Sequence, residues 1–198
     1  MKNLIITIAF ILSPLILFAQ ENETKPELGK VPKGYQFIKA GINFSTTSTG
    51  DQDVTSFSVL PVYGIFVAPN VSVALGVGYS SSKTKSGVGD EFLSNQDGLT
   101  FLGLSRQYKH VAAPFYIFLQ EDISFSTFND NVTDISSTGF GIGISPGFNY
   151  FMSNNLSIDV TLGRLGYDTT KPDGGDSSNT FGLSFDMFSI GFGVLYSW

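Results

Sequence analysis

The chain contains no cysteine, which excludes disulfide bonds, thiolate metal sites and lipid attachment to a cysteine. Only 14% of its residues are charged and the net charge is -6, so no nucleic-acid partner is expected, because a phosphate-binding face needs clustered Lys and Arg. After Phe18 no apolar run approaches the roughly 20 residues that a membrane-spanning helix needs. If the protein lies in a membrane, it must therefore cross as a β-barrel, which satisfies its backbone groups without water.

The N-terminus is typical of a cleavable secretory signal peptide. Lys2 supplies a positive charge, residues 4–18 are mostly apolar, and Ala19 precedes an acidic segment. The apolar run is too short for a membrane helix. We therefore expect a signal peptide at 1–20, a polar periplasmic tail at 21–33 and one domain at 34–198.

Beyond the tail, small or polar residues alternate with bulky apolar ones in segments of about ten residues. The alternation is clearest at 71–82 and at 137–151. Membrane strands have this length and this period, with the apolar side chains facing lipid. We expect eight strands, at about 35–46, 55–67, 71–82, 104–119, 123–129, 137–151, 156–168 and 181–198.

The expected connections alternate between short and long, which indicates which ends face the periplasm. Short turns are expected at 68–70, 120–122 and 153–155, and the longest connection at 83–100. Outer-membrane barrels have short periplasmic turns and long external loops. A soluble barrel would instead have to bury the apolar residues of 137–151 inside. The predicted fold class is all-β: an eight-stranded antiparallel up-and-down transmembrane β-barrel preceded by a cleavable signal peptide.

The C-terminus supports this prediction by resemblance. Gly193, Tyr196 and Trp198 have the spacing G-x-x-aromatic-x-aromatic, which resembles the terminal targeting strand of bacterial outer-membrane barrels. With the segments 141–151 and 191–198, the chain resembles the porin-family outer-membrane β-barrel domain, similar to small barrels of the OmpX type and to the OmpA transmembrane domain. The resemblance implies the outer membrane of a Gram-negative bacterium. It implies outer-membrane lipids, lipopolysaccharide and the barrel-assembly machinery as partners, and it says little about activity.

The interior of an eight-stranded barrel can be filled by side chains, so no open pore is expected. Lys39 and Asp159 lie at similar distances from the periplasmic strand ends, and we predict that they pair inside, because an unpaired charge there would be costly. The alternative is that each meets trapped water. Apolar side chains are expected to fill the periplasmic half: Leu60, Val62, Phe66, Phe115, Ile117, Phe151 and Leu195.

Two further charged or titratable residues have open interpretations. His110, the single histidine, is expected to face lipid in the outer half of its strand, where a lipid-modifying enzyme would need a base. No G-x-S-x-G motif accompanies it, so we expect no enzyme, no cofactor and no metal site. Arg164 either reaches the headgroups from the lipid face or is turned inward by a bulge.

The expected external loops are acidic. Their carboxylates could join lipopolysaccharide phosphates through divalent cations, or form a solvated surface that prevents aggregation, which we favour. The expected function is structural or surface display, in adhesion or envelope integrity, with extracellular ligands reached through the loops. The alternative is a lipid-modifying enzyme or a narrow solute channel.

Overall fold

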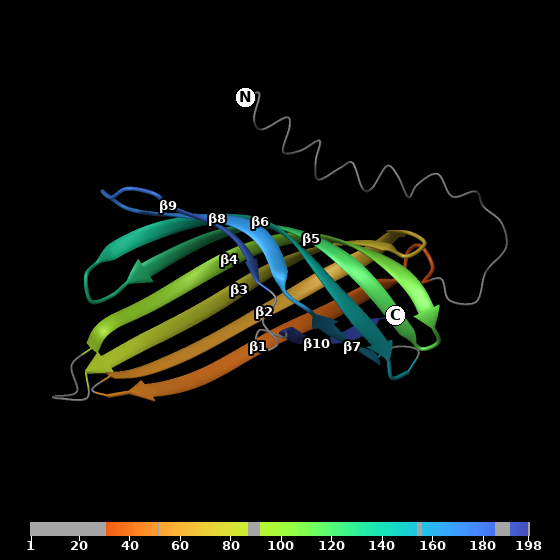
Figure 1. Cartoon of the computed structure of the whole chain (residues 1–198), viewed down its shortest axis with the longest axis horizontal. Helices are drawn as coiled ribbons and strands as arrows, with labels where there is room; N and C mark the ends of the chain where they lie inside the picture. The colour runs from red at the N-terminus through yellow and green to blue at the C-terminus, as the bar shows by residue number, and fades with distance from the viewer. Residues whose placement is uncertain (1–30, 51, 87–91, 154–155, 185–190, 198) are drawn as a thin grey trace, which may run out of the picture.

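The computed structural model describes residues 31–50, 52–86, 92–153, 156–184 and 191–197, with the backbone alone for 184 and 191–197 (Figure 1). All regular structure in these residues is antiparallel β-strand, and none of it is a helix long and apolar enough to cross a bilayer. The strands are β1 (Gln36–Thr49), β2 (Gln52–Ala68), β3 (Val71–Ser86), β4 (Phe92–Ala112), β5 (Phe115–Asp130), β6 (Ile135–Phe151), β7 (Leu156–Thr161), β8 (Arg164–Pro172), β9 (Ser178–Ser184) and β10 (Gly191–Ser197).

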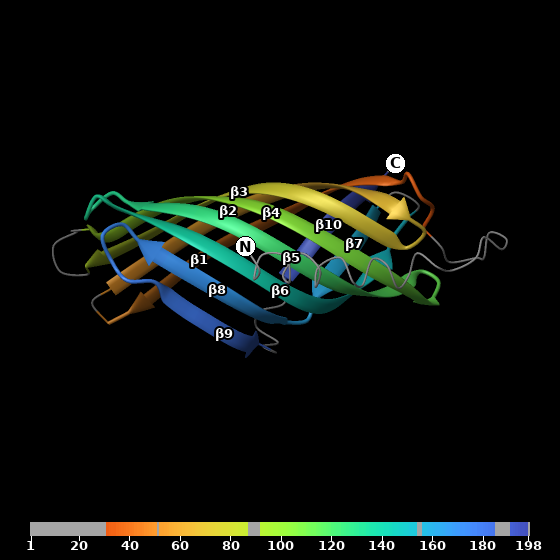
Figure 2. The same cartoon turned by 90° about the horizontal axis from the view of Figure 1, so that it is seen from above.

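Strands β1 to β6 pair in chain order, and β10 connects β1 with β7, which pairs in turn with β6. If each residue is traced to its paired residue on the next strand, Lys39 leads through β2, β3, β4 and β5 to Gly141 on β6. In the other direction, through β10 and β7, Lys39 leads to Phe151 on the same strand. This stagger along one strand is what tilted barrel strands require, and the tilt is visible in Figure 2. Among the described residues no ladder joins β1 to β9, so closure along the whole length stays a prediction.

The two faces of the sheet differ as predicted. Gly76 and Gly143 are buried, whereas Leu75 is 74% exposed and Ile144 is exposed as well. The exposed apolar side chains continue over all the long strands, a far larger patch than soluble monomers show. The small residues therefore face inward and the bulky apolar residues face lipid.

Two predicted strands are each divided in two. The strand expected at 156–168 consists of β7 and β8, separated at Leu162 and Gly163. Gly163 has a φ of 120°, in the region that favours glycine, and the Leu162 N–H donates to the Pro146 carbonyl at 2.8 Å. The strand expected at 181–198 consists of β9 and β10, and 185–190 between them lie outside the described residues.

The predicted boundaries of the fourth and fifth strands were wrong. The chain turns at Ala113 and Pro114, not at 120–122, and most of the connection expected at 83–100 belongs to β3 and β4. Proline cannot donate to a strand ladder, which suits it to the turn. The polar residues at 120–122 were mistaken for a turn because Glu121 occupies an outward position in β5, where the pattern predicts an apolar residue.

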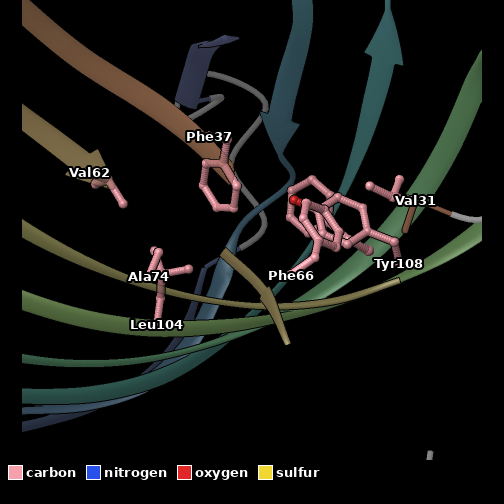
Figure 3. Close-up of a cluster of buried hydrophobic side chains, with 8 residues drawn as sticks. Val31, Phe37, Val62, Phe66, Ala74, Leu104 and Tyr108 are labelled. Carbon is pink, nitrogen blue, oxygen red and sulfur yellow. The ribbon is translucent and has the colours of Figure 1, made fainter. Parts of the chain in front are cut away.

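An aromatic cluster fills the interior at the end with the short turns (Figure 3). Ring centroids lie 5.9 Å apart between Phe37 and Phe66, 5.4 Å between Phe66 and Tyr108, and 5.7 Å between Tyr108 and Phe118. Val31 packs on the cluster, so the end of the expected polar tail is part of the core.

The predicted set of inward apolar residues is correct only in part. Val62 and Phe66 are buried in the aromatic cluster, and Leu60 and Phe151 pack against it. Phe115 and Ile117 face outward instead, because the true turn at Ala113 and Pro114 reverses the side assigned to each residue of that segment. The side chain of Leu195 lies outside the described residues.

Candidate functional site

The structure brings the two predicted interior charges together. Lys39 Nζ on β1 lies 2.7 Å from Asp159 Oδ2 on β7. A third residue joins them, because Arg106 Nη2 on β4 lies 2.9 Å from the same oxygen. Asp159 and Arg106 are fully buried and Lys39 is mostly buried. Two cations therefore share one carboxylate just above the aromatic cluster.

Arg106 is held by neutral partners as well as by the carboxylate. Its Nε donates to Gln120 Oε1 at 2.8 Å, and its guanidinium carbon lies 4.3 Å from the centroid of the Phe118 ring. Sequence reasoning missed Arg106, because the wrong turn position left no reliable inward face for this strand. No alternation of polarity marks the inward residue here, because Ser105, Arg106 and Gln107 are all polar.

A second ion cluster occupies the interior nearer the end opposite the aromatic cluster. Arg164 Nη1 lies 2.7 Å from Asp168 Oδ2, and Nη2 lies 3.3 Å from Asp122 Oδ2 on β5. A Cβ at Gly141 or Gly143 would collide with this cluster, so glycine makes room for the guanidinium. Of the two interpretations of Arg164, the inward turn is the correct one, and the break at Gly163 produces it.

The expected position of His110 was wrong. β4 runs toward the short-turn end, so His110 lies near that end, on the same inward face as Arg106. Its ring packs edge-on against Tyr116 with centroids 5.0 Å apart, and its buried Nε2 has no hydrogen-bond partner in the part of the chain that the structure describes. This geometry places the imidazole far from the outer leaflet, where a lipid-modifying base would act.

Hydrogen bonds connect neighbouring strands at the end opposite the short turns at 69–70 and 113–114, here called the outer rim. Asp97 on β4 accepts from Tyr79 Oη on β3 at 2.7 Å and from Asn131 Nδ2 at 2.8 Å. At the tip of β5, the Val132 N–H and the Ser94 hydroxyl donate to Asp130, and these bonds lower the pKa of its carboxyl. Within the described ranges no cluster of three or more acidic or histidine residues could hold a metal.

Two of the predicted targeting residues, Gly193 and Tyr196, lie on β10, which pairs with both β1 and β7. Gly193 pairs with Asp159 on β7, and Tyr196 pairs with Ile38 on β1. Trp198 lies outside the described residues. In this arrangement β10 lies between the first strand of the chain and β7.

Long tilted antiparallel strands, with lipid-facing apolar side chains and ion pairs inside, define a transmembrane β-barrel protein of the outer-membrane type. The chain belongs to the outer membrane protein beta-barrel domain family, whose model matches residues 10–194. It is an outer-membrane protein.

Comparison with solved structures gives distant similarities. Neisserial surface protein A is 16% identical with a TM-score of 0.49, covering 86% of this chain and 99% of that one. A major outer membrane protein from Thermus thermophilus is 18% identical with a TM-score of 0.39, covering 87% of this chain and 100% of that one. Comparison with curated protein sequences gives no match.

Proposed function

We propose that the protein is a surface-display barrel that holds long β-hairpins above the outer leaflet, in adhesion or envelope integrity. The observation that carries the proposal is the length of the strands. β4 has 21 residues and β6 has 17, whereas about 9 to 11 suffice to cross a bilayer. The aromatic cluster is at the short-turn end, so the additional length extends past the lipid on the opposite side.

The hydrogen bonds along this extension favour a stiff binding surface rather than a set of mobile loops. The Asn131 N–H donates to the Asn95 carbonyl at 2.8 Å, which ties the tip of one hairpin to its neighbour. The hydroxyls of Ser56 and Ser82 lie 3.0 Å apart between β2 and β3. A preorganised surface loses less conformational entropy when it binds a partner.

The interior supports a protein that neither conducts solutes nor catalyses a reaction. The aromatic cluster and the Lys39, Asp159 and Arg106 cluster lie across the same end. The single histidine lies near the short-turn end, so its position does not support the lipid-modifying alternative.

The test removes one hairpin tip without touching the barrel wall. Residues 83–95 are replaced by a two-residue turn that joins the partners Ser82 and Gln96. The matched control shortens the turn at 173–177, which joins β8 and β9 and takes part in neither of the two hydrogen bonds along the extension. Cells carrying the first variant should lose surface adhesion while the heat-dependent gel mobility of the folded barrel is unchanged.

Two results would contradict the proposal. If cells with the unmodified protein adhere no better than a deletion strain, the display role is excluded. A change of lipid A mass in the His110→Ala variant, read by mass spectrometry of membranes, would favour the enzyme instead.

A further inference from the structure

A polar patch interrupts the lipid-facing wall of β4 and β5. It consists of Ser105 and Gln107 on β4 and Glu121 on β5, and is here called the wall patch. Along β5 the outward positions on either side of Glu121 are Leu119 and Ile123, both exposed and apolar. The carboxyl therefore has apolar outward neighbours on both sides along β5, whereas on β4 the outward row continues from Gln107 to the exposed Lys109.

The wall patch is only partly satisfied by its own hydrogen bonds. Ser105 Oγ donates to Glu121 Oε2, and Gln107 Nε2 donates to Glu121 Oε1 at 3.3 Å. Through its side chain, Gln107 makes one hydrogen bond among the described residues, and this bond uses one of the two hydrogens on Nε2. Neighbouring side chains leave Glu121 only 9% exposed, yet polar groups facing hydrocarbon remain costly.

We infer that the wall patch is the interface through which a second copy of this chain docks in the membrane. The donors Ser105 and Gln107 lie on β4 and the acceptor Glu121 lies on the adjacent β5. A twofold axis between these strands, along the membrane normal, places the second N–H of Gln107 in each copy opposite the carboxyl of the other, while the Ser105 hydroxyl donates within its own copy. Such a patch is self-complementary, as an isologous interface requires.

The backbone around the wall patch also allows close approach. Gly103 lies two residues before Ser105 on the same outward face of β4. A Cβ at position 103 would lie 3.3 Å from Ile123 Cγ2. Glycine therefore leaves no side chain protruding from the outer surface beside the polar groups. Close approach lets the side chains of two copies form hydrogen bonds across the axis.

The absence of cysteine makes a cross-linking test direct, because any introduced thiol is the only one in the chain. Leu119→Cys is the reporter, since Leu119 pairs with Gln107 beside the proposed axis. Ile42→Cys is the matched control, an exposed lipid-facing residue on β1, away from the wall patch. Oxidation of each full-length variant in outer membranes should yield a disulfide-linked dimer for Leu119→Cys and none for Ile42→Cys.

The second arm tests whether the polar groups cause the association. Adding Glu121→Leu to the Leu119→Cys chain should reduce the dimer yield about tenfold, whereas adding Glu121→Gln should retain most of it. Heat-dependent gel mobility shows that each variant is folded, and Gln107→Leu replaces Glu121→Leu if that variant does not fold. Equal cross-linking at both cysteines, no cross-linking at Leu119→Cys, or a yield unchanged by loss of the carboxyl would each overturn the inference. Absence of cross-linking at Leu119→Cys would indicate that lipid or another protein covers the wall patch.

Discussion

The short-turn end and the outer rim of the same sheet are stabilised in different ways. At the short-turn end, aromatic rings and a buried ion cluster pack inside the ladders, so many side chains lose contact with solvent together. At the outer rim the strands continue, but their side chains are largely exposed and are joined by single hydrogen bonds such as that of Tyr79 to Asp97. The difference indicates that stability is concentrated at the short-turn end.

The ion cluster should give the largest effect on stability. Asp159→Asn leaves Lys39 and Arg106 buried without a carboxylate, so the free energy of unfolding should fall by about 3 to 5 kcal/mol. Adding Lys39→Met should recover part of this loss, because one uncompensated cation is then removed. Urea unfolding in lipid vesicles measures both variants, and purely additive losses would show that Lys39 and Asp159 are not coupled.

A pair of phenylalanine truncations tests the contrast between the ends directly. Phe66→Ala opens a cavity in the aromatic cluster and should cost about 3 to 5 kcal/mol. Phe181→Ala removes a side chain that is 76% exposed on β9 and opens no cavity, so its cost should be clearly smaller. The free energies of unfolding of the two variants are measured in the same vesicles and compared. Equal losses would refute the proposed concentration of stability at the short-turn end.

The smallest effect is expected from pH at the outer rim. Hydrogen bonds from the Val132 N–H and Ser94 lower the pKa of Asp130 in the folded protein, so the charged carboxylate stabilises the turn at neutral pH. This contribution should be lost as the pH falls below about 4, through the lowered pKa. The amide resonance of Val132 should follow this titration in the protein and not in Asp130→Asn. A titration unchanged in that variant would assign the effect to another group.

The alternation of side chains was sufficient to predict the class of fold, the location of the protein and most of the strands. Strands β3 and β6 begin and end close to the predicted positions, because small and bulky residues alternate in them without interruption. The same alternation placed Lys39 and Asp159 on the inward face, and the structure brings them within 2.7 Å. Prediction failed at β4 and β5, where polar residues at outward positions imitate a turn.

The sequence by itself determined which side chains face lipid wherever the period of two is unbroken, since that period is a local property of an extended chain. Only the tertiary structure decided which inward charges meet, because the stagger between strands brings Arg106 of β4 to Asp159 of β7. It also decided the direction of Arg164, since the strand breaks at Gly163, which has a positive φ, and the inward residues change from odd-numbered in β7 to even-numbered in β8. Contacts between distant strands depend on register, and register is set by the whole sheet.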